Sequence, residues 1–242
     1  GITASGVKAV EGITIATDKS IPFGTKIQIT EFSPKYGGYQ GKIYTVTDRG
    51  GAIKGNRIDV CYMTKNEAFS WGVTHATHLY NAMSGLGSRE PGMVGAVLDS
   101  EDVFAELICD GIHISPATLR ITFKALGEDR TVVVSDATMW AGLEPGEYML
   151  GGQKIYKTDA ARLADGTLAG SSTNLFEEFQ NLRSFGIPLR QAIKSVTINP
   201  AKAIGVDEKT GSIAEGKSAD LLILSEDFSE IKAVIIKGKK VV

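Results

Sequence analysis

The chain has 242 residues, of which 43% are apolar and 22% are charged, and its formal net charge is −2. This composition is typical of a globular protein that forms one large domain or two small ones. The small net charge argues against a nucleic-acid partner, and the longest apolar runs, such as Leu221–Leu224, are far too short to span a membrane.

The first 73 residues predict a small all-β domain. Alternation of apolar and polar residues predicts four strands, at Ile13–Thr17, Lys26–Thr30, Lys42–Val46 and Arg57–Cys61. Turn-forming glycines and a proline separate these segments. A short helix from about Lys65 to Trp71 is expected to follow, with Gly72 as its stop.

The pattern changes to α/β after Val73. Two mostly apolar segments, Glu106–Ile114 and Thr131–Asp136, predict strands that are buried on both faces of a parallel sheet. Helices are predicted over residues 173–185, where Asn174 and Glu177 suit the N-terminus, and from Pro188 onward. The last segment predicts strands at residues 219–224 and 231–237.

Two of the three histidines and one aspartate are candidates for a catalytic site in this second part. Asp136 ends one predicted strand and His113 ends another, which is where α/β barrels place catalytic groups. Together with His78 they would suit metal-assisted hydrolysis, in which a carboxylate moves the proton. The alternative is that the histidines are hydrogen-bonded core residues and that Asp136 is a helix cap or a turn former. His75 is not expected to share a metal with His78, because residues three apart on a strand point to opposite faces.

Several motifs favour the catalytic interpretation. They are Thr77–Met83 (THLYNAM), Arg89–Gly92 (REPG), Asp110–Ile114 (DGIHI), Val134–Ala137 (VSDA), Leu163–Ser171 (LADGTLAGS), Asn199–Ala201 (NPA) and Gly211–Asp220 (GSIAEGKSAD). In this order they resemble the C-terminal part of the N-acetylglucosamine-6-phosphate deacetylases of the amidohydrolase superfamily. The resemblance implies a partial TIM-like barrel plus a C-terminal β-layer, and a cytoplasmic hydrolase of an amino-sugar phosphate.

The resemblance also implies a role for each candidate residue. The implied roles are metal ligand for His78, sugar-phosphate contacts for Asn81 and Ala82, contact with the phosphate bound by a partner subunit for Arg89, substrate binding for His113, and general acid/base for Asp136. The role of Arg89 implies a homodimer. The donors fit a phosphate dianion, since arginine and amide groups bind it through charge-assisted hydrogen bonds.

This part of the chain departs from the family in one respect. The family's other metal ligands, a glutamate and a further histidine, and its first barrel strands have no counterpart before residue 74. A zinc site usually needs three protein ligands. We therefore expect a divalent metal, zinc by resemblance, if another chain completes the site, and otherwise none.

The first part carries its own candidate site. Asp18, Asp48 and Asp59 lie at or near predicted strand ends, and two carboxylates in a groove can cleave a glycosidic bond. The alternative is that they are turn formers. The runs Ile15–Asp18, Ile21–Thr25, Asp48–Asp59 and Glu67–Gly72 resemble the three-aspartate (3D) domain, a double-psi β-barrel of exported cell-wall proteins. The resemblance implies Asp59 as general acid, Asp48 as its partner, Asp18 as the third aspartate, and peptidoglycan as the ligand.

Together these patterns predict a chimera of two truncated domains, residues 1–73 and 74–242, joined near Trp71–His75. Three functional classes remain open: a metal-dependent deacetylase of N-acetylglucosamine 6-phosphate, a peptidoglycan-cleaving or peptidoglycan-binding module, and a non-catalytic fragment. Zinc content would separate the first class from the others, and retention on insoluble murein would separate the second.

Overall fold

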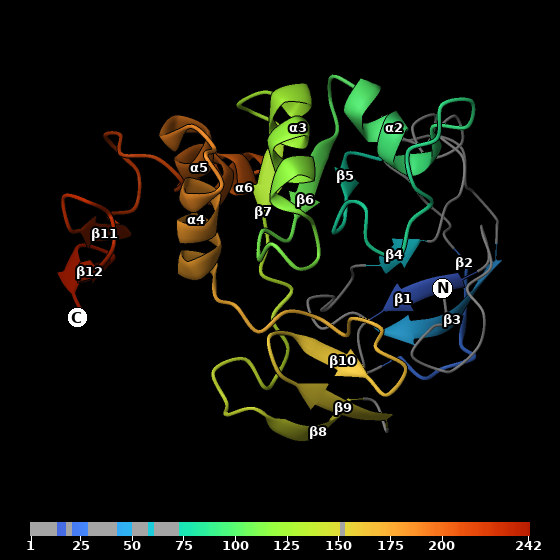
Figure 1. Cartoon of the computed structure of the whole chain (residues 1–242). Coiled ribbons are helices and arrows are strands. Elements are labelled where there is room, and N and C mark those ends of the chain that lie inside the picture. Colours follow the sequence, from blue (N-terminus) through green and yellow to red (C-terminus); the bar gives the residue numbers. More distant parts are fainter. Residues whose placement is uncertain (1–13, 18–20, 29–42, 50–57, 61–72, 151–152) are drawn as a thin grey trace. The chain divides into compact units, whose positions relative to one another are not determined.

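A computed structural model describes residues 14–17, 21–28, 43–49, 58–60, 73–150 and 153–242 (Figure 1). The chain divides into two compact units. The first comprises Gly1–Thr74 and Tyr80–Glu101, and the second comprises His75–Leu79 and Asp102–Val242. The predicted division at residue 73 stays a prediction. No helix among the described residues has the length and apolar character needed to cross a membrane.

The first unit contains a four-stranded mixed sheet in the order β2-β3-β1-β4. Its strands are β1 (Thr14–Thr17), β2 (Lys26–Gln28), β3 (Ile43–Arg49) and β4 (Ile58–Val60). Strand β1 runs parallel to β3 and antiparallel to β4. All four lie where alternation predicted strands. The double-psi barrel remains an expectation, and the helix predicted from Lys65 to Trp71 lies outside the described residues.

One helix, α2 (Gly92–Asp99), completes the described part of the first unit. Its buried residues are Val94, Gly95, Ala96 and Val97. Gly95 is needed for packing, because a Cβ atom there would lie 2.4 Å from the Cβ of Pro91. The helix therefore packs closely against the turn that precedes it.

A parallel sheet forms the centre of the second unit, in the order β5-β6-β7. Its strands are β5 (His75–Ala76), β6 (Phe104–Leu107) and β7 (Thr131–Val133). The crossover from β6 to β7 contains α3 (Pro116–Leu126) (Figure 1). This helix begins where the Ser115 side chain accepts a hydrogen bond from the Thr118 amide. Leu119 and Phe123 of this helix are fully or almost fully buried, as expected for a helix that covers a parallel sheet.

The remaining helices follow the predicted order. They are α4 (Leu175–Ser184), α5 (Leu189–Val196) and α6 (Ile198–Ala203). The predicted start of α4 is confirmed, because Asn174 and Glu177 form a reciprocal capping box. Asn199 in α6 donates hydrogen bonds of 2.9 Å to the carbonyls of Glu128 and Thr131, which ties the helix to the start of β7.

Two antiparallel sheets complete the second unit. The first has the order β10-β9-β8, and the second has the order β11-β12-β13. Their strands are β8 (Gly146–Leu150), β9 (Gln153–Lys157), β10 (Ala161–Leu163), β11 (Leu221–Leu224), β12 (Ile231–Ile236) and β13 (Lys239–Lys240). The sequence predicted the C-terminal sheet but not the other one, which packs Ile155 and Ala161 against the buried Trp140.

Two predicted strands are shorter than expected, which corrects the placement of two candidate residues. Strand β6 ends at Leu107, because the Asp110 carboxylate accepts hydrogen bonds of 2.8 Å from the amides of Ile112 and His113 and turns the chain. Strand β7 ends at Val133. His113 and Asp136 therefore lie in the segments that follow the strands, and not at the strand ends themselves.

Candidate active site

The three candidate residues of the second unit follow the three strands of its parallel sheet. His78 comes two residues after β5, His113 six residues after β6, and Asp136 three residues after β7. Because the strands are parallel, their carboxyl ends meet at one edge of the sheet. The charges of His78 and His113 both lower the pKa of Asp136, so the three groups lie within electrostatic range of one another.

His78 has two features that are unusual for a core histidine. Its φ is +34°, a backbone conformation that is uncommon outside glycine and is concentrated at functional sites. Its Nδ1 atom is buried and has no hydrogen-bond partner among the described residues. A hydrogen bond of 2.8 Å from the Leu79 amide to the Glu106 carbonyl fixes the turn. An unpartnered buried imidazole nitrogen is what a metal ligand would present.

Asp136 lies in a second strained turn, with φ at +46°. The Ser171 amide donates a hydrogen bond of 3.0 Å to the Asp136 carbonyl. Gly170 allows this approach, because a Cβ atom there would lie 3.1 Å from the same carbonyl oxygen and 2.5 Å from Thr138. Although the residue is exposed, partial burial of its carboxyl group raises its pKa, and the charges of His78 and His113 oppose that rise. A carboxyl group with a raised pKa is suited to accept and release a proton.

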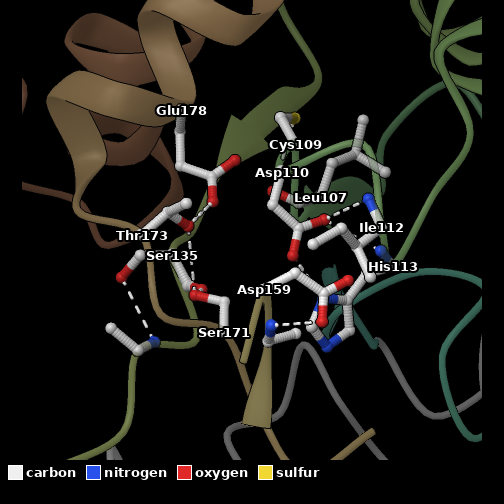
Figure 2. Close-up of polar contacts among 12 residues, drawn as sticks. Leu107, Cys109, Asp110, Ile112, His113, Ser135, Asp159, Ser171, Thr173 and Glu178 are labelled. Carbon is white, nitrogen blue, oxygen red and sulfur yellow. Dashed lines mark hydrogen bonds and ion pairs between the residues drawn. The ribbon is translucent and has the colours of Figure 1, made fainter. Parts of the chain in front are cut away.

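His113 forms a pair with Asp110, whose side chain is almost completely buried with it (Figure 2). The distance from His113 Nδ1 to Asp110 Oδ2 is 2.6 Å. Burial works to raise the pKa of Asp110, but the hydrogen bonds from His113 and from the Ile112 amide outweigh it, so the pKa lies below its usual value. A carboxylate on Nδ1 orients the imidazole and leaves Nε2 to face a ligand. The family resemblance implied a role for His113, whereas it implied none for Asp110.

A second buried carboxyl group, Glu178, lies beside these strand ends (Figure 2). Glu178 Oε1 is hydrogen-bonded to the Thr173 hydroxyl. Burial raises the pKa of Glu178 to about 7, and the charge of Asp110 adds to the rise. Sequence reasoning missed this residue. The sequence does contain an indication of its burial. Glu178 lies three residues after Leu175 and four before Leu182, which places it on the apolar stripe of α4.

Three further candidates belong to the first unit. Asn81 is half-buried, whereas Ala82 and Arg89 are exposed in the segment that precedes α2. Ala82 has φ at +55°. His78, His113 and Asp136 belong to the second unit. The roles of all six residues stay predictions.

His75 has a different environment from His78. Its ring stacks on Phe104 at a centroid distance of 5.5 Å, and burial lowers its pKa. His75 lies in β5 and His78 lies in the following turn, so the two residues do not share one strand. No group of three or more histidine, cysteine, aspartate or glutamate side chains within the described part of the chain is arranged to hold a metal ion.

The upstream carboxylates lie in the first sheet. Asp48 in β3 and Asp59 in β4 are both backbone partners of Ala16 in β1, so the two aspartates flank one residue from opposite sides. Neighbouring strands are about 4.8 Å apart, which puts the two α-carbons roughly 10 Å from each other. Asp18 lies outside the described residues.

Comparisons with known proteins match both parts of the chain. Residues 61–241 match the amidohydrolase family and residues 13–81 match the 3D domain, so the two matches overlap at residues 61–81. An N-acetylglucosamine-6-phosphate deacetylase of Bacillus subtilis is 34% identical over 217 residues, which cover 89% of this chain and 54% of that protein. An N-acetylgalactosamine-6-phosphate deacetylase of Escherichia coli O157:H7 is 34% identical over 71% of this chain and 46% of its own length.

Solved structures give the same result. The crystal structure of N-acetylglucosamine-6-phosphate deacetylase from Pasteurella multocida is 36% identical and superposes with a TM-score of 0.68, over 73% of this chain and 46% of that one. The chain thus spans about half the length of the relatives it matches. Because the family match covers three quarters of the sequence, including His78, His113 and Asp136, this chain belongs to the amidohydrolase family.

Proposed function

We propose that the second unit carries the acid/base part of a metal-dependent deacetylase that acts on an N-acetylated amino-sugar 6-phosphate. The observation that carries this proposal is the grouping of His78, His113 and Asp136 beyond the ends of three parallel strands. The names of the similar proteins support the substrate class. N-acetylglucosamine 6-phosphate is the proposed substrate, and the galactosamine epimer is the alternative.

The residues have complementary roles in this proposal. Nε2 of His113, oriented by Asp110, would bind the substrate, and Asp136 would accept a proton from the attacking water and pass it to the leaving nitrogen. A divalent metal at this site, zinc by analogy, would lower the pKa of water and polarise the amide carbonyl. Asn81, the Ala82 amide and Arg89 would bind the phosphate, with Arg89 acting across a homodimer.

We also propose that the metal site of this chain is incomplete. The unpartnered Nδ1 of His78 fits one ligand position. The described residues offer no group of three ligands, and a catalytic zinc usually has three. We therefore propose that a second polypeptide, equivalent to the N-terminal half of the relatives, supplies the others.

Complementation tests this proposal. The chain is mixed with the separately produced N-terminal half of the B. subtilis relative, and bound zinc and the release of acetate from N-acetylglucosamine 6-phosphate are measured. We expect little zinc and no turnover from the chain alone, and both from the mixture. About one tightly held zinc in the chain alone would contradict the incomplete site. Turnover in a mixture that contains His78→Asn would exclude His78 as a ligand.

A second function is favoured by the first sheet. Asp48 and Asp59 flank Ala16 across neighbouring strands, and residues 13–81 match the 3D domain. We propose peptidoglycan as the ligand of this unit, with Asp59 as general acid, Asp48 as its partner and Asp18 as the third aspartate. Such a ligand implies an exported protein, whereas the deacetylase function implies the cytoplasm. Retention of the chain on insoluble murein, and its loss in Asp59→Asn, would support this function.

A further inference from the structure

Glu178 is a buried carboxyl group that the proposed reaction does not use. It projects from α4 into the space between the segment that follows β6 and the segment that follows β7 (Figure 2). The residue has no exposed surface. Its Oε2 atom makes no hydrogen bond within the described part of the chain. An acid this deeply buried is costly in its charged form.

A chain of three polar contacts connects Glu178 to the backbone beside Asp136. Glu178 Oε1 contacts the Thr173 hydroxyl, the Thr173 and Ser171 hydroxyls are 3.2 Å apart, and the Ser171 hydroxyl donates to the Ser135 carbonyl. Ser135 immediately precedes Asp136. Ser171 also donates its backbone amide to the Asp136 carbonyl, at 3.0 Å. The position of Asp136 therefore depends on how Ser171 is held.

The number of hydrogens in this chain differs between the two states of Glu178. Each hydroxyl can donate one hydrogen bond and a carbonyl can donate none. With an ionised Glu178, the Thr173 and Ser171 hydroxyls provide two hydrogens for three contacts. With a protonated Glu178, the acid donates to Thr173, Thr173 to Ser171, and Ser171 to the Ser135 carbonyl. Only the protonated acid gives every contact a hydrogen.

The groups that face Glu178 act on its pKa in both directions, and burial is the largest influence and favours the protonated form. Asp110 contributes a negative charge from the segment that follows β6, and the charge of His113 partly offsets it. The Cys109 thiol has a pKa well above its usual value, chiefly because it is buried, so it adds no charge at neutral pH. The Cys109 amide and the Thr173 hydroxyl are the groups that favour the ionised form. Thr173 serves both states, since its hydroxyl can donate or accept.

We propose that Glu178 is a positioning residue that carries a proton in the folded protein and, through Thr173 and Ser171, fixes the Ser135–Asp136 turn. When the proton is lost, one of the three contacts loses its hydrogen and the turn is held less firmly. Any effect of Glu178 on turnover rests on the proposed deacetylase function. The protonation of Glu178 and its stabilisation of the Ser135–Asp136 turn are independent of that function.

Difference infrared spectroscopy on the full chain tests the protonation directly. Spectra of the wild type at about pH 5.5 and about pH 8.5 are compared with those of Glu178→Gln. We expect a carbonyl band of a buried carboxylic acid at the lower pH that disappears at the higher pH and is absent from Glu178→Gln at both. The matched control is Glu215→Gln, which replaces an exposed glutamate. This variant should keep the carboxylic-acid band at the lower pH, as the wild type does. If the wild type shows no such band at the lower pH, Glu178 is ionised and the proposal is wrong.

Hydrogen exchange of the Ser171 amide tests the hold on the turn. Glu178→Gln can still donate from its amide, so at about pH 8.5 it should protect this amide about tenfold more than the wild type does. Thr173→Val removes the middle of the chain and should abolish the protection at either pH, whereas Thr173→Ser should restore it. Equal protection in wild type and Glu178→Gln at both pH values would overturn the proposal. Neither measurement needs substrate or metal, so a failure here is distinct from a failure of the deacetylase assignment.

Discussion

Carboxylates occupy two different kinds of position in the two compact units. In the first unit, Asp48 and Asp59 lie within strands, and their backbones pair with Ala16. In the second unit, Asp110 and Asp136 lie in turns that follow strands. A residue within a strand is placed by the pleat of its sheet. A residue beyond a parallel strand is placed by the turn it helps to build, so it can be partly buried and brought beside residues from other strands.

The pKa shifts in the second unit are consistent with placement beyond strands. His113 holds Asp110 ionised, partial burial raises the pKa of Asp136, and full burial of Glu178 raises its pKa to about 7. Pairs of groups whose environments separate their pKa values are typical of sites that carry out acid/base chemistry. We therefore expect substitutions of these carboxylates to change turnover and the dependence of stability on pH.

Asp136→Asn should have the largest effect. It preserves size and removes the proton acceptor, so turnover in the complemented enzyme should fall by roughly 10²–10⁴-fold with little change in KM. Steady-state kinetics on N-acetylglucosamine 6-phosphate measure both quantities. Near-normal turnover of Asp136→Asn would show that Asp136 does not transfer the proton in the reaction. Asp165→Asn, in an exposed turn, is the matched control and should leave both constants unchanged.

Replacement of Glu178 should change how stability depends on pH. The unfolded carboxyl releases its proton near its usual pKa of 4.5, whereas the folded carboxyl keeps it to about 7. The folded state thus binds the extra proton between these values, and stability falls as the pH rises through this window and is level above it. At about 1.4 kcal/mol per pKa unit, the loss is on the order of 3 kcal/mol.

Denaturant unfolding of the wild type and of Glu178→Gln across this window measures the effect. The variant should lack this component of the pH dependence, because its amide does not titrate. Glu215→Gln should keep the wild-type profile. Parallel profiles for wild type and Glu178→Gln would mean that Glu178 titrates at its ordinary pKa despite its burial.

Arg89→Ala should mainly affect binding. The variant loses a charge-assisted hydrogen bond of about 1.5–3 kcal/mol to the substrate phosphate, so KM should rise roughly ten- to hundredfold while kcat changes little. Arg89→Lys keeps the charge without the bidentate geometry and should be intermediate. The amino sugar without its phosphate is the sharpest control, since wild type and variant should then behave alike. An unchanged KM would remove Arg89 from the phosphate site.

The sequence predicts those elements of the fold that depend on local patterns, and it does not predict those that depend on tertiary packing. Local patterns were enough for the four strands of the first sheet and for the cap of α4, because alternation and capping act over a few residues. The antiparallel sheet at residues 146–163 was missed, although Tyr148 and Ile155 lie in suitable alternating runs. Its strands surround Trp140, which comes earlier in the chain, and such packing is not visible in a local pattern.

The candidate site shows the same contrast between local patterns and tertiary contacts. Motifs marked His78, His113 and Asp136 as candidates, but they did not predict the backbone conformations at these residues or the groups that shift their pKa values. His113 was expected at a strand end and lies in a turn built by Asp110. Glu178 was missed because its burial depends on tertiary contacts with residues 65–70 positions earlier in the chain. In a sequence, an acidic residue on the apolar stripe of a predicted helix indicates that the acid is buried in tertiary contacts.

The smallest predicted effect concerns the C-terminal sheet. Leu222 and Ile223 are neighbours on β11 and therefore point to opposite faces, yet their exposed fractions are 54% and 49%. Within the described residues, neither face of this sheet is fully covered. Exposed apolar strands favour self-association. We expect the chain to associate in a concentration-dependent way.

Leu222→Lys should weaken this association modestly. A half-exposed leucine has about half of its transfer free energy left to gain, roughly 1 kcal/mol, so the association constant should fall about fivefold. Sedimentation over a range of concentrations measures it. Ile213→Lys is the control, because Ile213 is even more exposed, at 89%, but lies outside the sheet. An equal effect of both substitutions would indicate non-specific stickiness, and a monomeric wild type at high concentration would show that the C-terminal sheet needs no partner.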